Sequence, residues 1–311
     1  MISSFVSLKS DAYFRSQDPQ DPRLSSFRVE DPKLAAVHLW AYPDDEGIRL
    51  NGGRPGASEG PHHIRQAFYK MTPGPSPRAK IWDAGDLLMN EPLPARHERA
   101  ARCVQESLEA GKFVITLGGG HDYAYPDGKG FLKAFARSRK KPVILNFDAH
   151  LDVRPLDKGL TSGTPFYRLL TEFPKAFHFF EVGPQEHCNS QVHWDWCTER
   201  GGKVLSLQDI RKKGLLSLLK ASLSRYKGHP TFLSVDIDGF SSAIAPGCSQ
   251  SWPTGLHADE FFESLDYLMR HLAVKNLGVY EVSPPLDLGP LTSRLAALIL
   301  NRSLIDRRSR R

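Results

Sequence analysis

The chain has 311 residues, 40% hydrophobic and 24% charged, a composition typical of a soluble globular protein. No apolar run approaches the length of a membrane span, and the first residues lack the basic start and apolar stretch of a secretory signal. Four cysteines without disulfide or zinc-finger spacing fit a reducing compartment, so we expect a cytoplasmic protein. Without four arginines of the tail 307–311, the net charge of +6 falls to +2, and we expect a solvated basic tail and no nucleic-acid binding.

Strand-like and helical segments alternate after an irregular segment over 1–33. The expected strands cover 34–41, 80–85, 112–117, 142–147, 176–182, 203–207, 230–236 and 274–282. The expected helices cover 94–110, 124–138, 211–225, 258–273 and a segment from about 291. Apolar runs separated by helices are typical of a parallel sheet covered on both faces. We therefore expect a three-layer α/β/α fold with a mainly parallel central sheet, formed by one domain over 34–306.

Acidic residues and histidines follow three of these strands. The segments read Leu-Gly-Gly-Gly-His-Asp (117–122), Asn-Phe-Asp-Ala-His-Leu-Asp (146–152) and Ser-Val-Asp-Ile-Asp (234–238). In parallel sheets, functional groups gather beyond the carboxyl ends of the strands, and residues two apart in an extended segment point the same way. We therefore expect six side chains to converge: His121, Asp148, His150, Asp152, Asp236 and Asp238.

Four carboxylates and two imidazoles form a donor set typical of divalent metals. Without a thiolate, the set suits Mn²⁺, Fe²⁺, Co²⁺ or Zn²⁺, and its many oxygen donors favour Mn²⁺. A lone Asp-x-Asp at a strand end is more often a helix cap or a loop, so the prediction depends on the three segments together. They predict two metal ions, and a metal pair implies hydrolysis by an activated water.

This constellation resembles the ureohydrolase superfamily of arginases, agmatinases and formimidoylglutamases over roughly residues 35–300. The resemblance implies an arginase-like catalytic domain over 34–306 that binds two Mn²⁺ ions. The first ion would be ligated by His121, Asp148, Asp152 and Asp236. The second would be ligated by Asp148, His150, Asp236 and Asp238.

Three departures from arginases and agmatinases resemble the formimidoylglutamase branch. Asp238 is not followed by a further Asp-Pro, Ser162-Gly163 is not followed by a histidine, and Asp122 follows His121 in Gly-Gly-Gly-His-Asp. The glycine-rich segment 49–57 also fits this branch. The resemblance therefore implies hydrolysis of N-formimidoyl-L-glutamate to L-glutamate and formamide, a step of histidine degradation.

Catalytic and substrate-binding roles are also carried over from the resemblance. Glu281, in Glu-Val-Ser-Pro-Pro-Leu-Asp, would pair with the cationic amidine or guanidine group, although a structural salt bridge is the alternative. Asp238 would relay a proton to the leaving amine. Ser162, Arg54 and Arg154 are candidates to hold the substrate carboxylates, because guanidinium groups bind carboxylates in bidentate fashion. Arg54 solvated in a loop, and Arg154 supporting a ligand, are the alternatives.

Other functions stay open from the sequence. One is a guanidine hydrolase of the arginase, agmatinase or guanidinobutyrase type; another is a metal-binding homologue without turnover. The superfamily often forms trimers or hexamers, so we expect a homo-oligomer. A further group, His187, Cys188, His193 and Cys197, lacks the spacing of a closed zinc site, and we expect it to form a loop entering a helix.

Overall fold

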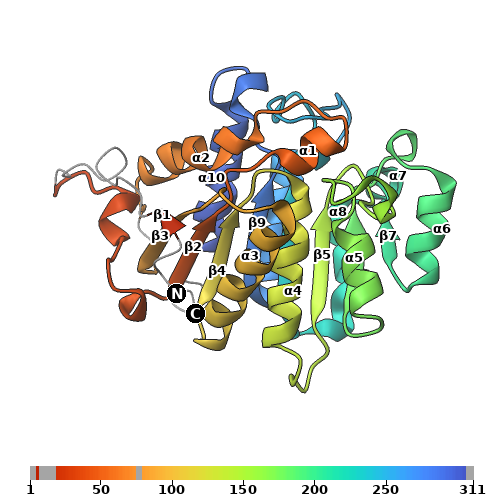
Figure 1. The fold of residues 1–311 in the computed structure, drawn as a ribbon, viewed down its shortest axis with the longest axis horizontal. Coiled ribbons are helices and arrows are strands. Elements are labelled where there is room, and N and C mark those ends of the chain that lie inside the picture. The colour runs from red at the N-terminus through yellow and green to blue at the C-terminus, as the bar shows by residue number, and fades with distance from the viewer. Residues whose placement is uncertain (1–4, 7–18, 75–78, 306–311) are drawn as a thin grey trace.

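A single nine-stranded sheet forms the centre of the computed structural model, which describes residues 5–6, 19–74 and 79–305 (Figure 1). The spatial order is β1-β3-β2-β4-β9-β8-β5-β6-β7. The strands are β1 (Phe5–Val6), β2 (Val37–Ala41), β3 (Ile81–Leu87), β4 (Phe113–Leu117), β5 (Val143–Phe147), β6 (His178–Val182), β7 (Lys203–Leu205), β8 (Pro230–Asp236) and β9 (Ala273–Tyr280). Only β1 pairs antiparallel within the described sheet, which confirms the mainly parallel arrangement.

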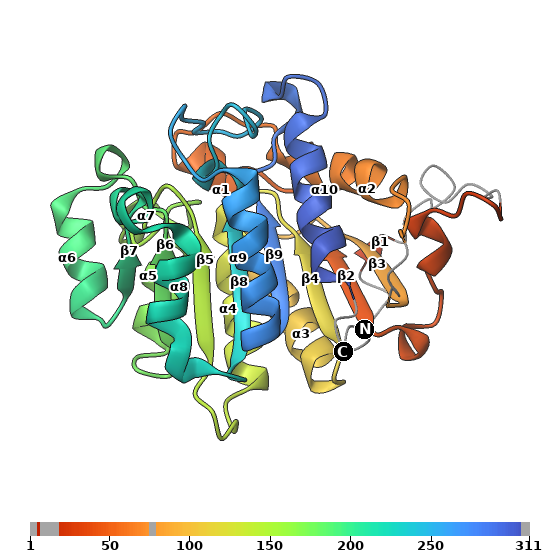
Figure 2. The ribbon, with the colours of Figure 1, turned by 180° about the vertical axis from the view of Figure 1, so that it is seen from behind.

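Helices cover both faces of the sheet (Figures 1 and 2). One face packs against α2 (Gly60–Tyr69), α7 (Leu207–Lys213), α8 (Leu215–Leu223), α9 (Ala258–His271) and α10 (Leu291–Ser303). The other face packs against α3 (Leu93–Glu109), α4 (Ala124–Ala134), α5 (Pro165–Glu172) and α6 (Gln191–Glu199). The short α1 (Glu46–Leu50) lies above the carboxyl ends of the strands. The expected three-layer α/β/α fold is confirmed.

One expected helix is divided in two. The segment 211–225 was expected to be continuous, but α7 ends at Lys213 and α8 begins at Leu215. Gly214 between them has a φ of 80°, a left-handed conformation that terminates a helix and that glycine adopts without a steric penalty. Helix α5 was not expected, because its eight residues are too few for a clear periodic pattern.

The two ends of the chain are described only in part. Within 1–33, the structure contains β1 and a 3₁₀ turn over Leu24–Phe27, so this segment is not wholly irregular. The basic tail 307–311 lies outside the described residues. Among the described helices, none combines the length and apolarity required to cross a bilayer.

The order of the central strands determines where polar side chains can meet. Strands β4, β9, β8 and β5 are consecutive neighbours and run parallel. Their carboxyl ends therefore lie along one short edge of the sheet, where the segments that follow them come together.

Candidate metal centre

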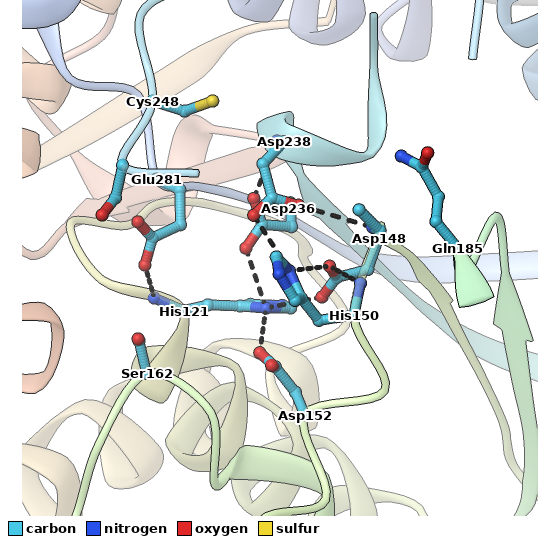
Figure 3. A network of polar contacts seen from close by, with 12 residues as sticks. His121, Asp148, His150, Asp152, Ser162, Gln185, Asp236, Asp238, Cys248 and Glu281 are labelled. Carbon is cyan, nitrogen blue, oxygen red and sulfur yellow. Dashed lines mark hydrogen bonds and ion pairs between the residues drawn. The ribbon is translucent and has the colours of Figure 1, made fainter. Parts of the chain in front are cut away.

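All six predicted metal ligands come together at this edge (Figure 3). His121 lies in a 3₁₀ turn after β4, and Asp148 follows β5 directly. Asp236 ends β8, and Asp238 lies in the turn after it. Two groups have ligand atoms within 4.8 Å of one another: His121, Asp148, Asp152 and Asp236 in the first, and Asp148, His150 and Asp238 in the second.

The imidazole of His121 is oriented as a metal ligand would be. Its Nδ1 lies 2.8 Å from Asp152 Oδ2 and 3.0 Å from Asp236 Oδ2. Its Nε2 lies 2.9 Å from the hydroxyl of Ser234, which can accept the ring N–H. A hydrogen bond at one ring nitrogen fixes the tautomer and leaves the other nitrogen free to bind a metal. Ser234 therefore supports the tautomer in which Nδ1 is the ligand.

Asp148 connects the two groups. Its Oδ2 lies 3.1 Å from His121 Nδ1, and its Oδ1 lies 3.3 Å from His150 Nδ1. The second group is completed by Asp238, whose Oδ2 lies 3.1 Å from His150 Nδ1. Asp236, expected to serve both ions, belongs only to the first group in this arrangement. One carboxylate with an oxygen in each group is the arrangement needed to bridge two ions.

The electrostatics of the cluster favour cations. Burial, and then the charge of Asp236, raise the pKa of Asp238 well above its ordinary value. Burial opposes the charge of the His121 imidazole, but Asp236 and the neighbouring carboxylates still raise its pKa well above the ordinary value. Crowded buried carboxylates repel one another, and divalent cations would neutralise this repulsion. The donor set and its charge therefore fit two divalent metal ions.

Glu281 follows β9 and faces the same cavity. Its backbone has a φ of 66°, an uncommon conformation for a non-glycine residue, and its Oε1 accepts a hydrogen bond of 3.0 Å from the backbone N–H of His121. Burial, and then the charge of Asp236, raise the pKa of the Glu281 carboxyl well above its ordinary value. Backbone strain and a buried carboxyl at one position are typical of a functional residue.

Side chains behind the ligands hold the segment after β5. The Asn189 side chain accepts a hydrogen bond of 2.8 Å from the Leu151 N–H and donates one of 2.9 Å to the Ala149 carbonyl. Asn189 therefore clamps the backbone between the ligands.

The metal-ligand cluster opens into a cavity of about 260 Å³. Arg154 and Ser162, the candidates to hold the substrate carboxylates, line it, and Asn51 donates a hydrogen bond of 3.1 Å to the Ser162 hydroxyl. Several lining residues outside the segment 49–57 were not assigned to the pocket from the sequence: His187, Cys188, Ser249, Gln250 and Trp252. They come from loops that only the fold brings together, so spacing along the chain gives no signal for them.

Arg54 does not line the cavity. Its Nε donates a hydrogen bond of 3.0 Å to the Ser249 carbonyl, and its Nη2 donates one of 3.1 Å to the Cys248 carbonyl. Ser249 in turn lines the cavity. In this structure Arg54 therefore fixes a wall of the cavity, in contrast to the direct substrate contact expected from the sequence.

A model of the arginase family matches residues 35–305 of the chain. The chain belongs to the arginase family. Among curated members, the chain is 35% identical over 303 residues to the formimidoylglutamase of Bacillus subtilis, covering 90% of this chain and 94% of the relative. It is 32% identical over 271 residues to the formimidoylglutamase of Clostridium tetani, covering 84% of this chain and 80% of the relative.

A solved structure of formiminoglutamase agrees with the fold. The crystal structure of Trypanosoma cruzi formiminoglutamase with two Mn²⁺ ions superposes with a TM-score of 0.81 at 30% identity, covering 92% of this chain and 98% of that one. The arginase-family model matches the chain from β2 to α10, so all residues of the candidate centre lie within the matched region.

Proposed function

We propose that this chain is a formimidoylglutamase, which hydrolyses N-formimidoyl-L-glutamate to L-glutamate and formamide with two Mn²⁺ ions. The observation that carries the proposal is the convergence of six predicted ligands into two groups that share Asp148. Its similarity to relatives named as formimidoylglutamases, including one solved with Mn²⁺, supports this substrate and this metal.

The residues that would hold the ions are those of the two groups, with Asp148 shared between them. When bound, two Mn²⁺ ions supply a water nucleophile that is activated near neutral pH. Oδ2 of Asp238 lies 3.1 Å from His150 Nδ1, and its Oδ1 accepts a hydrogen bond of 3.4 Å from the Ala149 N–H. The Asp238 carboxylate would take up a proton and pass it to the leaving amine. The segment after Ser162 contains no histidine before Phe166, so no imidazole there competes for this role.

The substrate would lie between Glu281 and Arg154, which both line the cavity. Glu281 has one oxygen bound to the His121 N–H, and its other oxygen would pair with the cationic amidine. Arg154 would bind a substrate carboxylate, because guanidinium groups form bidentate hydrogen bonds with carboxylates. Ser162, oriented by Asn51, would donate a further hydrogen bond to the same end of the substrate.

Turnover measurements on four substrates test this proposal. The protein loaded with Mn²⁺ is assayed with N-formimidoyl-L-glutamate, arginine, agmatine and guanidinobutyrate. We expect the highest kcat/KM for N-formimidoyl-L-glutamate. A higher value for any guanidine would assign the chain to a guanidine hydrolase instead, and two bound Mn²⁺ ions without turnover of any of the four would indicate a non-catalytic homologue.

The proposed activity also implies a pathway, a cellular compartment and an oligomeric state. A formimidoylglutamase would act in histidine degradation, and we propose a cytoplasmic homo-oligomer that binds neither membranes nor nucleic acid. Light scattering after size-exclusion chromatography tests the oligomeric state, and a monomeric mass at micromolar concentration would contradict it.

A further inference from the structure

A group of basic side chains lies at the edge of the sheet opposite to the candidate metal centre. We call Lys141, His178, Lys203, Arg225 and His229 the cationic cluster. Lys141 and His229 each precede the first residue of a strand by one or two positions, and His178 and Lys203 open β6 and β7. In Figure 1 this amino-terminal edge of the strands is at the bottom, whereas α1 and the loops over the metal centre are at the top.

The cationic cluster is assembled around one buried ring, that of Tyr226. The ring centroid lies 4.7 Å from that of His178 and 5.4 Å from that of His229. The guanidinium carbon of Arg225 lies 5.0 Å from the same centroid, and Lys203 Nζ lies 5.8 Å from it. Tyr226 is only 2% exposed, so these groups pack around a ring that is fixed in the protein interior.

Two interactions between neighbouring loops fix these positions. Nδ1 of His229 lies 2.8 Å from the Lys141 carbonyl, and Lys140 Nζ donates a hydrogen bond of 2.7 Å to the Lys227 carbonyl. The loop before β5 is thereby joined to the turn before β8. The convergence of positive charge is therefore a property of the backbone and not only of long, mobile side chains.

No ion pair within the described part of the chain neutralises the lysine and arginine charges of the cationic cluster. The ion pairs among the described residues include none with Lys141, Lys203 or Arg225. Burial, and then the positive charges of Lys141 and its neighbours, lower the pKa of His178 to about 4. His178 is therefore neutral near pH 7, and Lys141, Lys203 and Arg225 supply the positive charge of the cluster. Like charges held together without a partner oppose folding, and a bound anion would remove this repulsion.

We propose that the cationic cluster binds a small polyanion of the phosphate class. Ammonium and guanidinium groups only donate hydrogen bonds, and phosphoryl oxygens only accept them. Several cations in one cluster match an anion with several charges better than a single carboxylate. Tyr226 is buried and covered by Arg225 and Lys203, so its ring is not free to stack on a nucleobase. The phosphoryl groups, and not a base, would therefore be recognised.

Isothermal titration calorimetry with inorganic tripolyphosphate at low ionic strength tests this proposal. We expect saturable binding of one anion per chain, and ATP should bind with a Kd within about threefold of that of tripolyphosphate. The double variant Lys203→Gln/Arg225→Gln should raise the Kd at least tenfold. The matched control is Lys212→Gln/Lys213→Gln at the exposed end of α7, which removes the same charge elsewhere and should change the Kd less than twofold.

Three results would overturn the proposal. They are the absence of saturable binding to the wild-type protein, equal weakening by both double variants, and ATP binding that tripolyphosphate does not displace. Binding of a single-stranded RNA oligomer without competition by tripolyphosphate would replace the proposal by a nucleic-acid surface. Because Lys203→Gln/Arg225→Gln could perturb the fold, its circular dichroism melting curve is compared with wild type. The single variant Lys141→Gln should weaken binding as well.

Discussion

The side-chain amide nitrogen of Asn146 donates to two buried carboxylates on its two sides. Its Nδ2 lies 3.2 Å from Asp148 Oδ2 and 3.0 Å from Glu181 Oε2. Asn146 is on β5 and Glu181 is on the neighbouring β6, and both are fully buried. The shared ligand Asp148 is therefore held from behind by a hydrogen bond that is itself anchored in the next strand.

We expect Asn146→Ala to weaken Mn²⁺ binding about 10- to 100-fold, the usual effect of removing a residue that orients a metal ligand. Calorimetric titration of the metal-free protein with Mn²⁺ measures this. The control is Asn276→Ala on β9, a fully buried asparagine whose side-chain atoms have no hydrogen-bond partner among the described residues. It should leave the affinity within about twofold, and an equal loss in both variants would mean that packing, and not orientation of Asp148, is responsible.

Arg154 and Arg54 should differ in their effects on catalysis. Because Arg154 lines the cavity, Arg154→Gln should raise the KM for N-formimidoyl-L-glutamate at least tenfold while leaving Mn²⁺ affinity unchanged. Arg54→Gln removes hydrogen bonds to the Cys248 and Ser249 carbonyls, so it should chiefly lower the melting temperature. Steady-state kinetics and thermal unfolding measure both variants. A tenfold rise in KM for Arg54→Gln at unchanged stability would instead indicate that Arg54 contacts the substrate directly.

Asp127 should make folding stability depend on pH. It is fully buried and accepts hydrogen bonds from Tyr42, Thr116 and Tyr280. Burial raises the pKa of its carboxyl to about 6, although these hydrogen bonds lower it. A carboxyl with a raised pKa in the folded state binds its proton more tightly there than in the unfolded chain. It therefore stabilises the protein below that pKa and loses this contribution as the pH rises to about 6.

Replacing Asp127 isolates this contribution. The free energy of unfolding of wild type relative to Asp127→Asn should fall by about 2 kcal/mol between pH 4.5 and pH 7. Urea unfolding of both proteins at the two pH values measures the difference, and effects of other titrating groups cancel in the comparison. A wild-type protein that gains stability relative to the variant over this range would show that the carboxyl is preferentially ionised in the fold.

Removal of the metal should lower the stability of the wild-type protein. Each bound Mn²⁺ ion, at 100 times its Kd, should raise the free energy of unfolding by about 2.7 kcal/mol, and a chelator should reverse this gain. Asp238→Asn removes a ligand of the second group and one of four crowded carboxylates. It should reduce the gain from Mn²⁺ but be at least as stable as wild type in chelator.

Thermal unfolding measures this: wild type should have the higher melting temperature with Mn²⁺, and Asp238→Asn should have an equal or higher one in chelator. Asp157→Asn, at an exposed position in the turn Leu156–Lys158, is the control and should behave as wild type in both conditions. If Asp238→Asn were the less stable protein even in chelator, the carboxylate would have a structural role that does not depend on the metal.

The strands and the convergence of the six candidate ligands were predictable from the sequence because each depends on a local pattern. The run 230–236 was expected and observed as β8 with the same bounds, and the alternate residues Asp236 and Asp238 follow it. The partners that orient the ligands were not predictable in this way. Asn146 and Glu181 lie within apolar strand patterns, and their pairing follows from the adjacency of β5 and β6. The role of Arg54 likewise depends on the loop at Cys248 and Ser249, nearly 200 positions away.

The position of β8 and β9 in the sheet has a consequence for how the chain is made. These two strands are the last in the sequence, yet they lie between β4 and β5 at the centre. While the chain is still emerging from the ribosome, β4 and β5 each lack a neighbour on one side, and such open edges invite pairing with other chains. The candidate metal ligands have all been synthesised by residue 238, but β9, which lies between β4 and β8 and so places His121 beside the other ligands, is complete only at Tyr280. A nascent chain that binds the metal pair has therefore already closed its sheet.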